Sequence, residues 1–553
     1  MKKILLSLTT LLCSIPMLAQ WTSDPAENTR VSLLGQHDYG TEVVTNNKGI
    51  TYVARIIPEG KDADGQSFLS YRLQVLDKAG NRTLPEEGKV ISRDRNLSYT
   101  TVNQTLLVDK DGNAIIISHD CHNSAPTVNN LGYTVYKVSP DGTMLWGDKG
   151  VDLADGEVFQ GSAFLKAIQT TDGGYVFSYE TYDDASEAPS QVRVEKLTND
   201  GKKAWDDPIV LQDNKVPYSY SYLVDAGDNQ VMLVFLQGSN RNIMARMLDF
   251  DGSSVWSDDV KLYQGGFDAI PIQTHLKVNK APDGGAFVTW RDDRNNEGSY
   301  SNYISYVKND GTLGFPGGVN ALKISYADDY SRQGPMIAYD EQDKCVYAVY
   351  RQYSQALQSW SGIFIQKISM EGELKWGPEG KAVVDIQNSR SLGYATVQMA
   401  GGNDIAVFYQ TNAQGGGDVK SYAVKYDKEG NALWDKPLEF TTTVSEKNDL
   451  LSSELIDGSY WLLNWSDNRG GEDLYANTLY MQRINIDGTL GTPKTTAIDN
   501  IENTTDEVYD IYNMQGMYVK TVKGSVNANS GLNRGVYLVK SKAQAKALKV
   551  VVE

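Results

Sequence analysis

The sequence has little cysteine, histidine and proline for its length. Of its 553 residues, 3 are cysteine, 4 are histidine and 16 are proline. So few cysteines exclude a disulfide-stapled framework, and stability has to come from packing. Scarce proline and short runs rich in β-branched and aromatic residues favour an all-β protein with many turns, which the 50 glycines would supply.

Positive charge is also in deficit. The chain has 52 Lys and Arg against 70 Asp and Glu, a net charge of -18. Nucleic acid and anionic membrane surfaces are therefore excluded as expected partners, since both are bound through clustered Lys and Arg. After residue 19 no apolar stretch approaches the ~20 residues that a membrane-spanning helix needs, so we expect no transmembrane segment.

Residues 1–19 have the order of a secretory signal peptide. Lys2 and Lys3 form a basic start, an apolar run comes next, and Ala19 ends a short C-terminal region of the segment. We expect cleavage before Gln20. The predicted location is therefore outside the inner membrane, either secreted or at the cell surface.

A motif recurs along most of the chain. Residues 136–146 read YKVSPDGTMLW, and eight copies carry a glycine at intervals of 51 to 62 residues: Gly80, Gly142, Gly201, Gly252, Gly311, Gly372, Gly430 and Gly488. Such a regular period indicates a closed or stacked array of supersecondary units. We interpret each copy as a hairpin with its turn at the glycine and a return strand that carries a large aromatic residue.

Each repeat also contains a short apolar run that opens with a turn. The runs span 47–54, 111–118, 172–179, 228–235, 283–290, 343–350, 403–409 and 458–465. Their length and their Val, Ile, Phe and Tyr content predict strands covered on both faces. This pattern is typical of a β-propeller, and we expect eight blades of about 58 residues within residues 20–498, with seven as the alternative.

The two ends of the array are complementary. Residues 21–34 resemble the segment that comes after the glycine motif in other repeats, whereas the eighth repeat, after Leu490, lacks both the aromatic residue and a strand. We expect the N-terminal strand to complete the last blade and close the ring, which removes exposed sheet edges.

The repeated aromatic resembles the tryptophan-docking motif of quinoprotein-type propellers. It stands four residues after the glycine in six repeats: Trp146, Trp205, Trp256, Phe315, Trp376 and Trp434. The resemblance implies that these side chains fill the gaps between blades. The sequence has no adjacent cysteine pair of the kind that accompanies quinone binding, so we expect no cofactor. Residues 139–146 also resemble a sialidase Asp box, but Asp141 directly precedes the glycine and Trp146 is one residue late.

The C-terminal residues leave the repeat pattern. A polar linker at 499–506 precedes short strands with Asn513–Gly516 (N-x-x-G), Val519 and Gly531–Tyr537 (G-L-x-x-G-V-Y). Residues 507–553 thereby resemble the type A sorting domain of the type IX secretion system of Bacteroidetes, without its usual Pro-Asn-Pro opening. The resemblance implies a small β-sandwich-like domain recognised by that machinery. A small β domain that serves only packing is the alternative.

Three repeats share a polar loop after the apolar run. It reads SHDCH at 118–122, WRDDR at 290–294 and WSDNR at 465–469. Because equivalent loops of a ring lie on one face, we expect these side chains to surround a common funnel: Asp120, Asp292, Arg294, Asp467 and Arg469. The alternative is that each aspartate caps its own turn and pairs with the arginine. His119, Cys121 and His122 offer metal-compatible atoms, but alternation along a strand sends His122 away from the other two, so we expect no metal.

These features favour a non-catalytic binding module for a glycan or a protein. No G-x-S-x-G, H-E-x-x-H or Walker loop occurs in the sequence. The alternative is a secreted polysaccharide hydrolase or lyase with two acidic groups, or an acid and a base, across the funnel. A purely structural surface protein is a third class.

Overall fold

The structure is a computed structural model of the whole chain. It describes residues 21–32, 39–61, 65, 67–85, 87–94, 103–120, 132–157, 159, 161–182, 189–264, 276–294, 299–326, 330–357, 359–469, 478–493, 508–513, 516–523, 532, 535–541 and 547–552. The chain divides into two compact units, Met1–Gly491 and Thr492–Glu553. The boundary expected near residue 498 lies outside the described residues.

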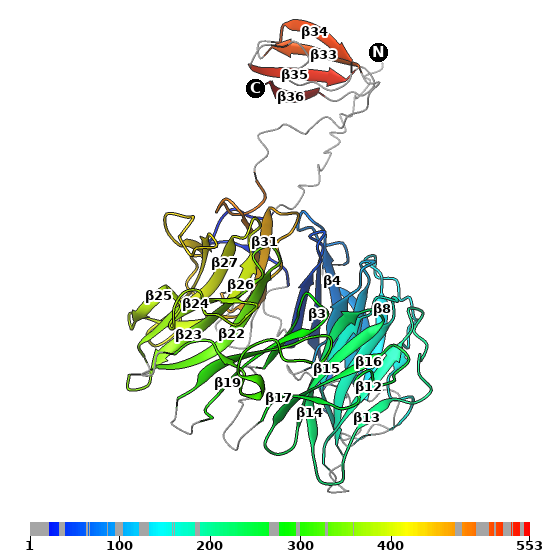
Figure 1. Cartoon of the computed structure of the whole chain (residues 1–553). Helices are drawn as coiled ribbons and strands as arrows, with labels where there is room; N and C mark the ends of the chain where they lie inside the picture. Colours follow the sequence, from blue (N-terminus) through cyan, green and yellow to red (C-terminus); the bar gives the residue numbers. More distant parts are fainter. Residues whose placement is uncertain are drawn as a thin grey trace, which may run out of the picture. The chain divides into compact units, whose positions relative to one another are not determined.

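The described residues are almost entirely β (Figure 1), which confirms the predicted class. The one helical element among them is the 3-10 turn η1 (Gly318–Asn320). No described helix is long and apolar enough to cross a bilayer. In the first unit, four-stranded antiparallel sheets follow one another along the chain.

Sheets 1 to 4 each use four consecutive strands. Sheet 1 contains β2 (Tyr39–Thr45), β3 (Thr51–Lys61), β4 (Ser67–Leu76) and β5 (Lys89–Asp94); sheet 2 contains β6 (Leu106–Val108), β7 (Ala114–Asp120), β8 (Gly132–Val138) and β9 (Val151–Asp152). Sheet 3 contains β10 (Gly161–Gln169), β11 (Tyr175–Tyr182), β12 (Gln191–Leu197) and β13 (Ile209–Leu211); sheet 4 contains β14 (Tyr218–Gly227), β15 (Gln230–Gln237), β16 (Asn242–Asp249) and β17 (Val260–Tyr263).

Sheets 5 to 7 repeat this order. Sheet 5 contains β18 (Lys277–Lys280), β19 (Ala286–Asp292), β20 (Ser301–Val307) and β21 (Leu322–Lys323); sheet 6 contains β22 (Tyr330–Asp340), β23 (Cys345–Ser354), β24 (Ser361–Ser369) and β25 (Lys381–Gln387). Sheet 7 contains β26 (Arg390–Met399), β27 (Ile405–Ala413), β28 (Val419–Tyr426) and β29 (Leu438–Thr441).

Sheet 8 combines both ends of the unit. It contains β30 (Lys447–Ser452), β31 (Tyr460–Asp467) and β32 (Thr478–Asn485), and its fourth strand is β1 (Thr29–Arg30) from the start of the chain. Thr29 pairs with Met481 and Arg30 with Tyr480. The two complementary ends noted in the sequence are thus neighbours in one sheet.

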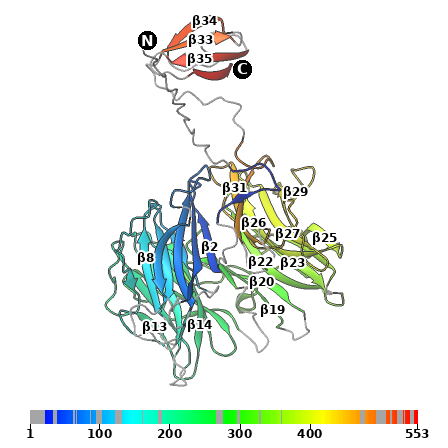
Figure 2. The ribbon, with the colours of Figure 1, turned by 180° about the vertical axis from the view of Figure 1, so that it is seen from behind.

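The predicted apolar runs form the second strand of each sheet, where both faces are covered. All seven residues of β7 are buried, for example. Eight clusters of buried side chains each join two consecutive sheets, and one of them joins sheet 8 to sheet 1 through residues such as Tyr460, Met481 and Val53. The core therefore lies between sheets, as the side-by-side sheets in Figures 1 and 2 indicate.

The glycine motif joins neighbouring sheets. Trp146 donates its indole N–H to the Asn199 carbonyl (3.2 Å), in the turn of the next sheet. Gly201 of that turn has φ 81°, and a Cβ there would lie 2.8 Å from the Trp146 ring. Only glycine suits both the left-handed backbone and this close approach. The expected return strand is wrong: it shrinks to a single bridge, Val138↔Met144, and Trp146 lies in the turn beyond it.

Trp21 supplies the aromatic residue that the eighth repeat lacks. It is 1% exposed, and its indole N–H donates to the Lys78 carbonyl (3.0 Å). A Cβ at Gly80 would lie 3.2 Å from its ring. This is the contact that Trp146 makes with Gly201, and here it links sheet 8 to sheet 1.

The second unit contains one four-stranded sheet among the described residues. Its order is β34 (Tyr518–Lys523), β33 (Val508–Asn513), β35 (Gly535–Ser541), β36 (Ala547–Val552). Asn513 and Gly516, the two named residues of the N-x-x-G motif, stand at the end of β33 and before β34, where the Gly516 N–H donates to the Asn513 carbonyl (2.9 Å). Tyr509, Ile511 and Val539 form the centre of a small core.

Candidate functional site

The three polar loops identified in the sequence begin at equivalent places. Asp120, Asp292 and Asp467 are the last residues of the second strands β7, β19 and β31. All three are buried, at 3%, 1% and 0% exposure. Burial of an aspartate requires a full set of hydrogen-bond donors nearby, so the partners of each carboxylate decide what it does.

Asp292 is held by its own loop. The indole N–H of Trp290 donates to one carboxylate oxygen (2.8 Å), and Arg294 donates through Nε (2.9 Å) and Nη2 (2.6 Å). Nη1 of Arg294 donates to the Asn320 carbonyl (2.6 Å), and the guanidinium lies 3.4 Å from the ring centroid of Tyr303. This Trp–Asp–Arg clamp fixes the segment that leads into β21.

Asp467 forms the same clamp in sheet 8. Trp465 donates to it (3.1 Å), as do Nε (2.9 Å) and Nη2 (2.6 Å) of Arg469. Burial raises the pKa of Asp467, but the hydrogen bonds and charge of Arg469 outweigh it and lower that pKa overall. Nη1 of Arg469 donates to the carbonyls of Ala26 and Glu27, both at 3.0 Å. The clamp therefore fixes the N-terminal segment.

The third loop is partly outside the described residues, which exclude Cys121 and His122. Asp120 accepts hydrogen bonds from Ser118 and from Thr134 (2.9 Å). His119 has Ser162 Oγ 3.0 Å from Nε2 and Asn103 3.3 Å from Nδ1, and burial lowers its pKa to about 4. No group of three potential metal ligands occurs among the described residues.

The structure thus gives the predicted site residues intramolecular partners. Asp292 pairs with Arg294 and Asp467 with Arg469, and no described contact joins the three aspartates to one another. Their roles in binding an external ligand remain predictions.

A second set of polar residues occupies one position on the first strands of several sheets. First strands of neighbouring sheets contact each other, as β10 does β14 and β14 does β18. Glu42, Lys166, Tyr222 and Lys277 pair with Ala54, Ser178, Val234 and Thr289 of their second strands. Each partner stands five residues after the turn residue that opens its run, which is Gly49, Gly173, Asn229 or Gly284. We name these four residues the inner ring.

Contacts and charges show that the inner ring converges. The Lys166 ammonium lies 5.9 Å from the ring centroid of Tyr222, whose hydroxyl donates to the carbonyl of Leu276 (3.1 Å), next to Lys277. Burial lowers the pKa of Lys166, the charge of Glu42 opposes this, and the charge of Lys277 adds to it. Glu42, Lys166 and Lys277 belong to sheets 1, 3 and 5. The contacts run from sheet 3 through sheet 4 to sheet 5, so Lys166, Tyr222 and the start of β18 lie together.

An aromatic pair lies beside the inner ring. Phe164 and Tyr220 occupy bulges of β10 and β14, with ring centroids 4.0 Å apart. Their φ angles are 58° and 51°, in the left-handed region that bulky residues rarely adopt. Glu180 of β11 accepts a hydrogen bond from the Tyr220 backbone, and burial raises its pKa to about 7. Strain and a perturbed carboxyl together are typical of functional sites.

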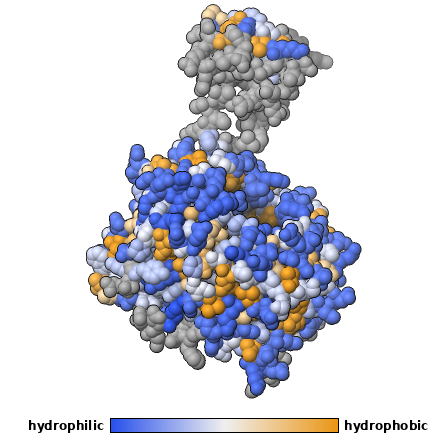
Figure 3. Space-filling model, in the orientation of Figure 1, coloured by the Kyte–Doolittle hydropathy of each residue, from blue (hydrophilic) through white to orange (hydrophobic). Residues whose placement is uncertain are grey.

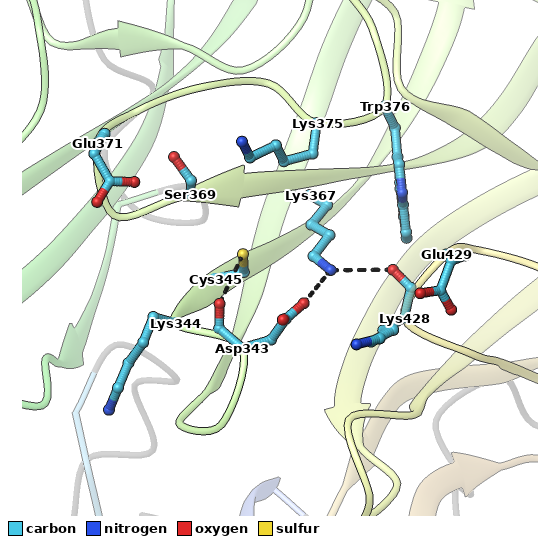
Figure 4. Close-up of a pocket in the computed structure, with 10 residues that line it drawn as sticks. All are labelled: Asp343, Lys344, Cys345, Lys367, Ser369, Glu371, Lys375, Trp376, Lys428 and Glu429. Carbon is cyan, nitrogen blue, oxygen red and sulfur yellow. Dashed lines mark hydrogen bonds and ion pairs between the residues drawn. The ribbon is translucent and has the colours of Figure 1, made fainter.

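A pocket of about 620 Å³ lies elsewhere, at the turns of sheets 6 and 7. In Figure 4 the Lys367 ammonium bridges Asp343 and the Lys428 carbonyl (3.1 Å). Lys196 makes the same bridge between sheets 3 and 4, to Asp172 (2.5 Å) and the Phe250 carbonyl (3.5 Å). This bridge is a repeated feature of the framework, so the pocket is not the candidate site.

The sequence predicts the polar loops as a candidate site, but it does not predict the inner ring. Its signal is an interval: each member stands 12 residues before its partner, as Lys166 before Ser178 and Lys277 before Thr289. The four residues are a glutamate, two lysines and a tyrosine, so an alignment of the repeats shows no common residue type at this position. The position can be recognised only when the order of the strands in each sheet is known.

Comparison with known proteins gives fold-level similarities. No protein-family model matches the sequence, and no curated protein sequence matches it significantly. The polysaccharide lyase Uly1 is 12% identical over 74% of this chain and 93% of its own, with a TM-score of 0.42. The WD40 domain of SCAP from fission yeast is 10% identical over 82% and 93% (TM-score 0.38), and an α-L-arabinanase from Penicillium chrysogenum 12% over 59% and 94% (TM-score 0.32). These values assign no activity to this chain.

Proposed function

We propose that the first unit is an eight-bladed β-propeller closed by β1. Eight four-stranded sheets among the described residues of this unit, and eight clusters that join each sheet to the next and the last to the first, support this count. In a closed ring every sheet packs against two neighbours, so no face of the first or last sheet is left exposed.

The unit is carried, in this proposal, by an exported protein of a Bacteroidetes-type organism. Residues 1–19 would direct export, and the second unit would engage the type IX secretion machinery, leaving the propeller secreted or on the cell surface. The hairpin at Asn513–Gly516 supports the resemblance on which this rests. Truncation after residue 498 should retain the protein in the periplasm of a host that has this system, and surface display of the truncated chain would contradict the proposal.

The propeller acts as a non-catalytic module that binds a glycan at the inner ring. The observation that carries this is the chain of contacts from Lys166 of sheet 3 through Tyr222 of sheet 4 to Leu276, next to Lys277 of sheet 5, since equivalent positions of a ring meet at its centre. On the face seen in Figure 3, hydrophobic residues are scattered among hydrophilic ones rather than gathered in a broad patch. That face lacks the apolar area of a protein-docking surface.

A paired glycan and peptide array tests this function. We expect saturable binding to glycans and no release of shortened or unsaturated products from the same glycans. Binding to peptides alone, or to nothing on the array, would contradict it.

A polysaccharide-active enzyme is the second candidate, and Glu180 is the observation that favours it. A carboxyl whose pKa is about 7 can hold a proton for a leaving group at neutral pH. Under this alternative, turnover appears in a substrate screen and falls at least about 100-fold in Glu180→Gln with binding retained. Absence of turnover in the wild-type chain removes the candidate.

A further inference from the structure

The charge of the inner ring contrasts with that of the protein. The chain has a net charge of -18, yet the inner ring contains two lysines and one glutamate. The glutamate is already engaged, since one oxygen of Glu42 accepts from the Thr105 N–H (2.6 Å), the Thr105 hydroxyl (3.0 Å) and the Leu106 N–H (2.9 Å). These hydrogen bonds tie Glu42 to sheet 2, and its charge also acts on Lys166, whereas no charge of Glu42 acts on Lys277.

Lys277 has unused binding capacity. Among the residues that the structure describes, its ammonium has no hydrogen-bond or ion-pair partner, and burial lowers its pKa. Lys166 lies close enough for its pKa to be lowered by the charge of Lys277. Two half-buried ammonium groups that repel each other would both be stabilised by an anion between them.

The aromatic pair restricts the shape of the ligand that can bind beside the lysines. In sheet 6 the corresponding bulge contains glycine, Gly334, with φ 71°, so the bulge itself does not require an aromatic residue. Phe164 and Tyr220 adopt the same left-handed backbone, which bulky residues adopt only under strain. Both are half-buried. An apolar surface is thus held, under strain, beside the lysines.

We propose that the inner ring binds the carboxylate of an acidic saccharide, a glycan that contains uronic acid, between Lys166 and Lys277, with the apolar face of a sugar ring against Phe164 and Tyr220. This rests on the proposed glycan-binding function and adds the chemical class of the ligand. An acidic peptide would satisfy the lysines but presents no flat C–H face to the aromatic pair.

Titration calorimetry on the full exported chain tests the proposal. The probes are a galacturonic acid hexasaccharide and the same hexasaccharide as its methyl ester, which keeps the sugar rings and removes the charges. We expect the acid to bind at least about tenfold more tightly. Lys277→Met should remove that difference, and Lys277→Arg should retain most of it, because the positive charge remains.

Lys280→Met is the matched control. Lys280 lies on the same strand, and its replacement removes the same charge from a side chain that is 53% exposed and 3.5 Å from Asp225. We expect no change in either affinity. Phe164→Gly, which relieves the strained backbone, should weaken both probes about equally and stabilise or leave unchanged the fold.

The outcomes separate the two proposals. Equal affinity for acid and ester overturns carboxylate recognition but keeps glycan binding. Equal binding of a sulfated hexasaccharide, or tighter binding of a glutamate hexapeptide, also overturns it. If neither uronate probe nor any array glycan binds, the proposed function fails as well. A loss of affinity in Lys277→Met with the thermal midpoint unchanged, and none in Lys280→Met, supports the inference.

Discussion

Sheets 5 and 8 contain the same Trp–Asp–Arg clamp, but they hold different parts of the chain. Arg294 donates to Asn320, 26 residues further along, whereas Arg469 donates to Ala26 and Glu27, more than 440 residues earlier. Asn320 and Glu27 both stand two residues before the fourth strand of their sheet. Identical chemistry therefore orders a local connection in sheet 5 and joins the two ends of the ring in sheet 8.

Sheet 8 differs further in the number of hydrogen bonds that hold the segment around its fourth strand, β1. Asn28 donates to the Phe440 carbonyl (2.9 Å) and to Gln482 (2.8 Å), and the Thr442 N–H donates to the Pro25 carbonyl (2.9 Å). Sheet 5 has no need of such contacts, because β20 and β21 are joined by continuous chain. A closure formed by a separate segment thus requires more bonds than one formed by a connected strand, since the loop that closes it is far longer.

Deletion of residues 21–30 should have the largest effect. It removes the buried Trp21, the fourth strand of sheet 8 and every partner of Arg469 in that segment. We expect a loss in the free energy of unfolding of about 5 kcal/mol or more, from the tryptophan and the pairing together. Urea denaturation followed by tryptophan fluorescence measures it.

Limited proteolysis of the deletion variant shows which sheets become accessible to cleavage. Cleavage should begin in sheet 8, where β32 loses its partner strand, and at the turn of sheet 1 that Trp21 covers, and not in sheet 5. A deletion variant as stable as the intact chain, with unchanged cleavage sites, would show that β1 does not close the ring.

Arg469→Ala and Arg294→Ala sharpen the comparison at single residues. Each leaves a buried aspartate without its cation, for which about 3–5 kcal/mol is typical. Arg469→Ala also loses the bonds to the N-terminal segment, so we expect it to cost about 1–2 kcal/mol more. Hydrogen exchange should accelerate at residues 25–30 in Arg469→Ala alone. Equal acceleration there in both variants would mean that the clamps are not specific to their sheets.

Acid should loosen sheet 8 through Asp467. Its pKa is lowered in the folded chain, so its contribution to stability is present above the ordinary pKa of the carboxyl and is lost as pH falls through the lowered value. As the pH falls below about 4, exchange at residues 25–30 should rise in the wild type. Asp467→Asn should be less stable at neutral pH and should lack this component of the acid dependence. Identical pH profiles for the two chains would contradict the assignment.

Much of this fold follows from local pattern. The apolar runs became second strands because each is short, rich in β-branched and aromatic residues, and opened by a turn, and covering on both faces explains their lack of alternation. The prediction that Trp146 lies on a return strand is wrong, because the residues after the turn pair with β8 through a single bridge, Val138↔Met144. Hairpin turns do not reveal how many residues pair after them.

The site was harder to predict for a physical reason. In Trp290–Arg294 the sequence shows an aspartate and an arginine at close spacing, which suits a ligand site and a self-contained clamp equally well. Only the hydrogen bonds of the buried aspartate distinguish a ligand site from such a clamp. Lys166 and Lys277 were missed because their proximity depends on which strand lies innermost, a tertiary property that spacing alone does not contain.

The smallest effect separates the two tryptophan contacts. A Cβ at Gly80 would lie 3.2 Å from Trp21, and one at Gly311 would lie 3.2 Å from Trp256, with φ 87° and 83°. Gly80→Ala and Gly311→Ala should therefore share a backbone cost of about 1–2 kcal/mol. The tryptophans differ: Trp256 is tethered by paired strands on both sides, whereas Trp21 is tethered on its C-terminal side by the short segment that leads to β1. Fluorescence quenching by acrylamide should consequently increase in Gly80→Ala and stay near the wild-type value in Gly311→Ala. Equal quenching in the two variants would mean that closure by Trp21 is as firm as an ordinary contact between consecutive sheets.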